Sequence, residues 1–138
     1  MALVKIKDWI TREIVTIGPE ASVKEAFMLL KSMGIRHLPV VKEGTLKGIV
    51  TDRDLRRPKL SDVFKSWDQL YRINDEIQVE DIMASPAVTI SEDATIQEAA
   101  EIMAKNRIGA LPVTDKKGKL DGIITESDIL RAFAAGKK

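Results

Sequence analysis

Cysteine is absent from the 138 residues of this chain. Disulfides are therefore excluded, and so is a zinc site built on thiolates, which suits a reducing cytoplasm. Histidine occurs only once, so a metal site made of several histidines is excluded as well. The sequence also lacks a signal-peptide core and any run of about 18 apolar residues. We therefore expect a soluble, cytoplasmic protein with no membrane segment.

The chain also lacks a charge excess of one sign, and it has few aromatic side chains. The chain has 22 basic and 21 acidic residues, so its formal net charge is +1, and the two signs are interspersed. Proteins that bind nucleic acid usually have a basic excess or a basic stripe. Aromatic residues make up 4% of the chain, too few for a surface on which bases stack. Nucleic acid is therefore not expected as a partner.

What the chain does have is an internal repeat. The stretch I-R-H-L-P-V at 35–40 returns as I-G-A-L-P-V at 108–113, a shift of 73 positions. At the same shift, V-T-I at 15–17 meets an identical V-T-I at 88–90. Two copies are too few for a solenoid, and they suit a pseudo-twofold pair that buries a shared face.

A second block of the repeat follows one inserted residue near Lys117. The shift then becomes 74, and G-I-V-T-D-R-D at 48–54 meets G-I-I-T-E-S-D at 122–128. Because both blocks occur in the same order in both copies, the repeat covers nearly the whole chain.

The first copy has the pattern of five elements. Its V-T-I segment predicts a short strand, and S-V-K-E at 22–25 is a capping box that begins a helix. This helix is expected to stop at Gly34. Two strands at 38–41 and 46–50, joined by a glycine-containing turn, come next. A last helix begins near Thr51, so the order is β-α-β-β-α.

The second copy repeats these signals with small differences. T-I-Q-E at 95–98 is again a capping box, and the last helix begins near Thr125. Arg107 stands where the first copy has Gly34, and it is a less suitable helix stop. The turn between the strands contains the inserted residue near Lys117.

These patterns predict an α+β fold, with α/β-like connectivity, in which a tandem of two repeats forms one compact module. The first repeat is placed at 4–57, a helical linker at 58–76 and the second repeat at 77–135. The linker carries apolar side chains on one helical face, which either pack on the body or contact a partner or a second copy. These side chains belong to Val63, Phe64, Trp67, Leu70 and Tyr71.

A family resemblance rests on these repeated pieces. In order, a D-W-I or D-I-M stretch, V-T-I, L-P-V and G-[IV]-[IV]-T-x-x-D occur twice over about residues 4–133. In this the chain resembles a tandem pair of CBS domains, also called a Bateman module. The runs V-K-I-K-D-W-I, G-I-R-H-L-P-V-V and G-I-V-T-D-R-D-L-R look closest to stand-alone bacterial proteins of the acetoin-utilisation AcuB type.

The resemblance implies a regulatory sensor of adenosine nucleotides and not an enzyme. Ligands across the family include AMP, ADP, ATP, NAD and S-adenosylmethionine, held in a cleft between the repeats that offers two potential sites. Such a module would sense energy or cofactor state and signal to a regulated protein, which the sequence does not identify. CBS modules commonly pair into flat discs, so the resemblance also implies a homodimer. A link to acetoin metabolism rests on the family name alone.

The two T-x-x-D motifs are the first candidate ligand groups. Thr51 with Asp54, and Thr125 with Asp128, have the spacing of a capping box, which a helix start needs in any case. A helix start also presents N–H groups that suit a phosphate, and a carboxylate there can accept hydrogen bonds from a ribose diol. By the resemblance, the aspartates bind ribose, and the threonines lie beside ribose or phosphate.

Basic residues distinguish the two copies. Arg36 and His37 precede the L-P-V strand, whereas the second copy has Gly109 and Ala110 there. An isolated arginine or histidine is usually just a solvated or packed residue. By the resemblance, these two point at phosphates, and Arg53 adds a further contact; an arginine can engage two oxygens at once. The sites should thus be unequal: either both phosphates share Arg36 and His37, or the second site prefers a less charged ligand.

An adenine pocket needs apolar walls and backbone groups, and ordinary core packing would explain the same residues. By the resemblance, the pocket in the two copies is lined by Ile14, Val15, Ile35, Ile49, Ala87, Val88, Ile108, Gly109, Ala110 and Ile123.

Two other functions remain as alternatives. Catalysis is disfavoured because the chain has no P-loop, no G-x-G-x-x-G, no cysteine and no positioned nucleophile. The acidic groups near Asp54 and Asp128 would hold Mg²⁺ only together with a nucleotide. A dimerisation or interaction scaffold that has lost its ligand is the other alternative, and a sensor of S-adenosylmethionine is a variant of the first.

Overall fold

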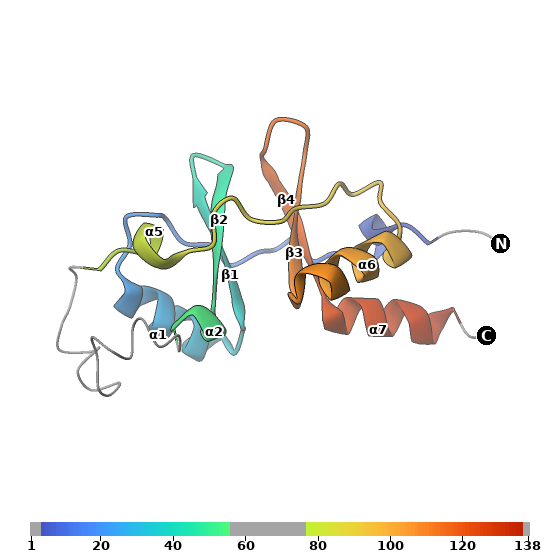
Figure 1. Cartoon of the computed structure of the whole chain (residues 1–138), viewed down its shortest axis with the longest axis horizontal. Helices are drawn as coiled ribbons and strands as arrows, with labels where there is room; N and C mark the ends of the chain where they lie inside the picture. The colour runs from blue at the N-terminus through green and yellow to red at the C-terminus, as the bar shows by residue number, and fades with distance from the viewer. Residues whose placement is uncertain (1–3, 56–76, 137–138) are drawn as a thin grey trace. The chain divides into compact units, whose positions relative to one another are not determined.

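The structure is a computed structural model that describes residues 4–55 and 77–136. Helices and strands alternate along the chain (Figure 1), which confirms the predicted α+β class. None of the helices in the described ranges is long and apolar enough to cross a membrane. The elements are η1 (Ile6–Asp8), α1 (Val23–Met33), β1 (His37–Lys42), β2 (Thr45–Thr51), α2 (Asp52–Leu55), α5 (Val79–Ile82), α6 (Ile96–Asn106), β3 (Ala110–Thr114), β4 (Leu120–Thr125) and α7 (Glu126–Ala135).

The chain folds into two compact units that are not simply its two halves. The central unit is Val15–Ala87, and the outer unit combines Met1–Ile14 with Val88–Lys138. The predicted limits of the repeats, at 4–57 and 77–135, were set from the sequence pattern and stay a prediction. The units instead exchange the short segments with which each repeat begins.

In the outer unit, the N-terminal segment is bound to the second repeat. The Ile6 N–H donates to the Ala94 carbonyl at 2.9 Å. The Thr11 and Ile123 backbones exchange two hydrogen bonds, of 2.9 and 3.0 Å. The Ile6 side chain is fully buried. Residues from the beginning of the chain are therefore part of the core built by its end.

The central unit mirrors this arrangement. The Val79 N–H donates to the Ala21 carbonyl at 2.8 Å, and the Ile49 and Ala84 backbones exchange hydrogen bonds of 3.1 and 2.9 Å. Val79 is fully buried, as Ile6 is in the outer unit. The segment with which the second repeat begins thus completes the core of the first.

Each unit contains one antiparallel hairpin, β1–β2 or β3–β4. The first hairpin turns through Glu43 and Gly44, whose φ angles are 53° and 81°. Two consecutive positive φ angles are typical of the two-residue turn that matches strand twist. The predicted strands and their turn are confirmed.

The inserted residue lengthens the second turn, which spans residues 115–119. The Asp115 carboxylate accepts hydrogen bonds from the backbone N–H groups of Lys117 at 2.8 Å and Lys119 at 2.9 Å. The bond from Lys119, followed by that from Lys117, holds the pKa of the Asp115 carboxyl below its ordinary value. A side chain therefore closes the longer turn.

The V-T-I segments form less sheet than predicted. Ile17 makes a single parallel bridge to Val40, its N–H donating to the Pro39 carbonyl and its carbonyl accepting from the Val41 N–H. Its equivalent, Ile90, makes the same single bridge in the outer unit. The register between β1 and β2 shifts between Val40 and Val41, so that Lys47 of β2 is left without a partner in the ladder.

The helix starts predicted at Ser22 and Thr95 are both found, but of these two only the box at Thr95 is complete. The Thr95 hydroxyl accepts from the Glu98 N–H at 3.1 Å, and the Glu98 carboxylate accepts from the Thr95 N–H at 3.1 Å. The Ser22 hydroxyl likewise accepts from the Glu25 N–H at 3.1 Å. The Glu25 side chain is exposed and does not complete a box in the described structure.

The helix stops are equivalent in spite of their different residues. Gly34 ends α1 with φ 64°, as predicted, and Arg107 ends α6 with φ 56°. Arg107 thus ends its helix in the same left-handed conformation, although glycine suits that conformation better. A non-glycine residue in the left-handed region costs on the order of 1–2 kcal/mol, which the packing of the helix must offset.

Each unit has its own hydrophobic core. The central core consists of Ile17, Val23, Ala26, Leu30, Leu38, Val40, Val50 and Val79. The outer core consists of Ile6, Ile90, Ala99, Met103, Leu111, Val113 and Ile124. The predicted linker helix at 58–76 lies outside the described residues.

Candidate functional site

Both T-x-x-D motifs lie where a hairpin runs into a helix, at the end opposite the turn. In β1–β2 register, His37 faces Thr51, and in β3–β4 register, Ala110 faces Thr125. We call these places the first hairpin end (Arg36, His37 and residues 51–54) and the second hairpin end (Gly109, Ala110 and residues 125–128).

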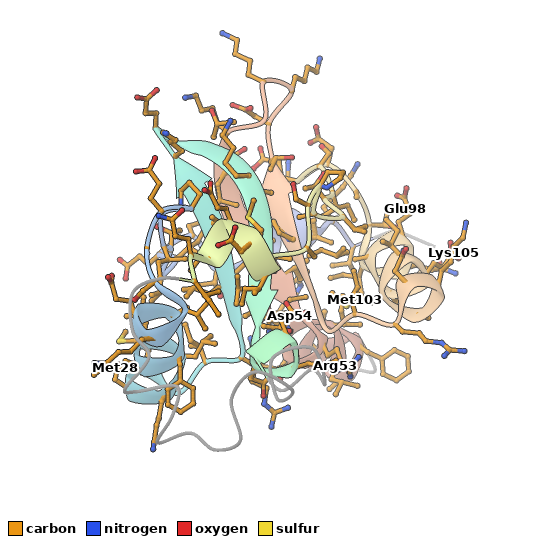
Figure 2. The ribbon with its side chains drawn as sticks, turned by 60° about the vertical axis from the view of Figure 1, so that its left-hand side comes forward. Met28, Arg53, Asp54, Glu98, Met103 and Lys105 are labelled. Atoms are coloured by element: carbon orange, nitrogen blue, oxygen red, sulfur yellow. The ribbon has the colours of Figure 1, made fainter. Side chains whose placement is uncertain are left out.

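At the first hairpin end, Thr51 and Asp54 form a reciprocal cap. The Thr51 N–H donates to Oδ2 of Asp54 at 2.9 Å, and the Asp54 N–H donates to Oγ1 of Thr51 at 3.1 Å. Asp54 is only 6% exposed. Figure 2 shows it beside Arg53 on the short helix α2. The capping interpretation of this motif is therefore confirmed, and a role toward a ligand would be additional to it.

At the second hairpin end, Asp128 accepts hydrogen bonds from Thr125 and Arg131. Its Oδ2 accepts from the Thr125 N–H at 2.8 Å and from the Thr125 hydroxyl at 3.1 Å. Its Oδ1 accepts from Nη2 of Arg131. The sequence reasoning missed Arg131, although Arg57 stands at the equivalent position of the first copy, 74 positions earlier. Arg57 lies outside the described residues.

The basic residues that the sequence singles out are gathered at the first hairpin end. The Asp52 N–H donates to the Arg36 carbonyl at 3.1 Å, which joins the start of α2 to the start of β1. Arg36 and Arg53 are exposed, and His37 is half-buried opposite Thr51. Candidates separated by about 15 positions in the sequence thus lie together.

The second hairpin end has the same backbone with different side chains. The Glu126 N–H donates to the Gly109 carbonyl at 3.0 Å, as Asp52 does to Arg36. Ala110 is 3% exposed and is packed into the outer core region. Ser127, exposed on α7, occupies the position of Arg53. This end therefore has no basic residue at the positions of Arg36, His37 and Arg53.

The predicted adenine-pocket residues are half-buried for the most part. In the central unit, Val15 and Ile35 pack against the core, and Ile49 is half-buried opposite Pro39 in the hairpin. Ala87, in the same unit, is also half-buried. Side chains of this kind keep part of their surface available for an apolar contact.

Their counterparts in the outer unit are more varied. Ile108 packs against the core, Ile123 is 8% exposed, and Val88 is 39% exposed. Ile14 and Gly109 are half-buried. Ile123 is therefore mainly a core residue.

The glycines of the repeated G-[IV]-[IV]-T-x-x-D motif have a structural role that the sequence reasoning missed. A Cβ on Gly48 would lie 2.6 Å from the Ala84 carbonyl oxygen, and a Cβ on Gly122 would lie 2.9 Å from that of Thr11. Both oxygens belong to the exchanged segments. The glycines are thus required because another backbone crosses each hairpin closely.

Across the described ranges, no group of three or more acidic, histidine or cysteine side chains is placed to hold a metal ion.

The sequence of this chain was compared with those of known protein families. A model of the CBS domain matches residues 6–60 and again residues 79–135. The chain belongs to the CBS domain family. The predicted tandem pair is confirmed, because the two matches correspond to the two copies of the repeat.

Curated relatives of this CBS pair include proteins of very different length. The MJ1225 protein of Methanocaldococcus jannaschii is 37% identical over 131 residues, 94% of this chain and 47% of that protein. A CBS domain-containing protein of Dictyostelium discoideum is 38% identical over 130 residues, 92% of this chain and 89% of that protein. An inosine-5'-monophosphate dehydrogenase of Korarchaeum cryptofilum is 35% identical, but the alignment covers 24% of that enzyme. The chain thus spans about half of the first relative and a quarter of the dehydrogenase.

Solved CBS structures match over nearly the whole chain. CBSX2 of Arabidopsis thaliana, solved in complex with AMP, is 27% identical with a TM-score of 0.82, covering 98% of this chain and 99% of its own. The CBS pair of MJ0100, solved with 5'-methylthioadenosine and S-adenosylmethionine, is 31% identical with a TM-score of 0.80, covering 99% and 100%. The acetoin utilization protein AcuB of Vibrio cholerae is 29% identical with a TM-score of 0.78, covering 98% and 95%.

Proposed function

We propose that this CBS pair is a regulatory module that binds an adenosine nucleotide, with AMP, ADP, ATP or NAD as the candidate ligands. The observation that carries the proposal is the grouping of Arg36, His37 and the Thr51–Asp54 cap at the first hairpin end. These groups supply what a sugar-phosphate needs: a carboxylate for hydroxyl groups and cationic donors for phosphate oxygens.

Each residue has a role in this proposal. Asp54 accepts hydrogen bonds from the ribose, and a carboxylate has lone pairs beyond the one that the Thr51 N–H uses. Arg36, His37 and Arg53 contact the phosphate. Val15, Ile35 and Ile49 contact the adenine with the part of their surface that the core leaves exposed.

Relatives support this ligand class. CBSX2 was solved with AMP, and the MJ0100 pair with 5'-methylthioadenosine and S-adenosylmethionine. All of these ligands contain adenosine. The MJ0100 ligands favour a second candidate function, a sensor of S-adenosylmethionine, at 31% identity to this chain.

Regulation would act through a population shift. A nucleotide that binds one conformation of the module more tightly than another increases the population of the first, and a partner protein responds to the difference. By family resemblance, the module works as a homodimer. Exposed apolar side chains on α7, Leu130 and Phe133, support a contact with a second copy.

Isothermal titration calorimetry tests this proposal. AMP, ATP, NAD and S-adenosylmethionine are titrated in turn into the wild type and into the Asp54→Asn variant. Asparagine still accepts the Thr51 hydrogen bond but loses the charge. We expect the best ligand to bind the variant with a free energy about 1.5–3 kcal/mol less favourable, the size of a lost charged hydrogen bond.

The matched control is Asp81→Asn. Asp81 is also a carboxylate that accepts a backbone N–H at a helix start of the central unit, that of Gln78 at 2.9 Å, and it lies outside the hairpin end. Its variant should bind the ligand as the wild type does. Equal affinity of Asp54→Asn and wild type would remove Asp54 from the site, and no binding of any of the four compounds would favour an interaction scaffold.

A further inference from the structure

The turn of the second hairpin is basic and closed by several hydrogen bonds. Its residues 115–119, which we call the basic tip, include three lysines and one aspartate, all exposed, with a formal charge of +2. The Asp115 N–H donates to the Lys119 carbonyl at 3.0 Å, and the Gly118 N–H donates to the Asp115 carbonyl at 3.1 Å. Because the Asp115 carboxylate accepts two more backbone N–H groups, the lysines project from a well-defined turn.

The same end of the first hairpin has the opposite charge. Lys42 is paired with Glu20 at 3.0 Å, and Glu43 follows it in the turn. The hydrogen bond and charge of Glu20, followed by the charges of Glu43 and Glu80, raise the pKa of Lys42 above its ordinary value. Three carboxylates therefore lie around one lysine. We call this group the acidic tip; its four exposed residues have a formal charge of −2.

The two tips are equivalent places of the repeat at which the charges are reversed. At the shift of 73 positions, Lys42 corresponds to Asp115 and Glu43 to Lys116. Each tip lies at the end of its hairpin that points away from the helix after it (Figure 1). The tips are therefore separate from the hairpin ends, and a role for them does not require a nucleotide.

We propose that the basic tip of one copy binds the acidic tip of a second copy of this chain. Opposite tips attract each other and like tips repel each other, so the contact is head-to-tail. A pair of copies joined in this way retains one tip of each sign, to which further copies can bind. Exposed ion pairs are individually weak, so the contact depends on several lysines together and on low salt.

Nuclear magnetic resonance tests this contact between copies. Unlabelled wild type is added to a low concentration of isotope-labelled wild type, in which the amides of Gly44 and Gly118 report on the acidic and the basic tip. Both amides should shift at about 0.01 M salt, where the Debye length is about 30 Å. Both should stay in place at about 1 M salt, where that length is about 3 Å.

An unlabelled variant with a reversed basic tip separates the two halves of the contact. In Lys116→Glu with Lys117→Glu, the backbone hydrogen bonds that close the turn are retained. The Gly44 amide of the labelled wild type should respond to this variant with at least about tenfold lower apparent affinity. The Gly118 amide should respond at least as strongly as before, because the acidic tip of the variant is intact.

Reversal of the acidic tip should give the opposite pattern. Glu20→Lys with Glu43→Lys should act on the acidic tip of the labelled wild type and no longer on its basic tip. The matched control is Lys31→Glu with Lys105→Glu, which changes the net charge as much as the first variant does. Its two positions are exposed on α1 and α6. The control should shift both glycine amides as wild type does.

Four results would overturn the inference. One is the absence of any shift at low salt, and another is an equal loss of both responses with either tip variant. A third is a response to salt without a response to the added copy, because the two tips would then attract each other within one chain. The fourth is a control variant as weak as the tip variants, which would reduce the effect to net charge. The proposed nucleotide site would be unaffected by any of them.

Discussion

Asp54 and Asp128 have a structural task that is independent of any ligand. Each is nearly fully buried and accepts the N–H of the threonine that begins its helix. A buried carboxylate without hydrogen bonds would be costly, so the cap is what allows these side chains to lie at the hairpin ends. The T-x-x-D spacing suggested a cap and a ligand site as alternatives, and a single carboxylate has enough lone pairs for both.

The close contact between Gly48 and the Ala84 carbonyl can be tested through stability. Gly48→Ala should lower the free energy of unfolding by about 1–3 kcal/mol, the range for overpacking, because the new Cβ meets a backbone carbonyl that cannot rotate away. Urea denaturation measures the difference. The control is Gly18→Ala, since a Cβ at Gly18 has nothing within 4 Å. Equal stability of the two variants would contradict the close approach of the Ala84 carbonyl to Gly48.

Among the elements, the exchanged segments η1 and α5 contribute to the core in spite of their short length. η1 and α5 are very short, yet each inserts one fully buried side chain, Ile6 or Val79, into a core formed by the other repeat. Helices of this length are not stable alone, so packing and the backbone hydrogen bonds to the neighbouring repeat maintain them. The two repeats are therefore expected to depend on each other for folding.

We expect Ile6→Ala to destabilise the protein by about 2–5 kcal/mol, because it leaves a cavity in the outer core. Hydrogen exchange should accelerate more for the amides of β3 and β4 than for those of β1 and β2. Val4→Ala serves as the control, since Val4 is 44% exposed in the same segment. Faster exchange confined to the central unit would contradict the assignment of Ile6 to the outer core.

At the scale of the whole molecule, two exposed apolar side chains on α7 bear on assembly. Leu130 is 68% and Phe133 is 63% exposed, one turn apart on α7. Contiguous apolar patches on a protein surface mark interaction sites, and these two side chains are neighbours on one helix. A homodimer that forms through α7 would cover these exposed side chains.

Light scattering after gel filtration tests this proposal. The wild type should have the mass of a dimer, and Leu130→Glu should shift it to that of a monomer, because burying an unpaired carboxylate is unfavourable. Gln97→Glu places the same charge on the exposed face of α6 and should leave the dimer intact. A monomeric wild type would exclude the dimer.

Much of this protein follows from its sequence alone. The repeat, the hairpins, the starts of α1, α2, α6 and α7 and the stop at Gly34 were predictable, because they depend on residues that are neighbours in the chain: caps, turns and alternating apolar positions. The T-x-x-D pairs and the contrast between Arg36 and Gly109 were visible as well, since a repeated sequence can be compared with itself. Family membership followed from the order of these short pieces.

Tertiary structure decided what depends on distant residues. The sequence could not show that η1 packs on the second repeat and α5 on the first. Both repeats offer equivalent backbone partners, so residue spacing alone does not distinguish them. The need for glycine at Gly48 and Gly122 became evident only when the crossing segments were placed. The V-T-I segments form single bridges to β1 and β3, and the extent of such pairing depends on strands distant in the sequence. Local chemistry thus determined the elements, and packing between segments far apart in the sequence determined which of them complete each core.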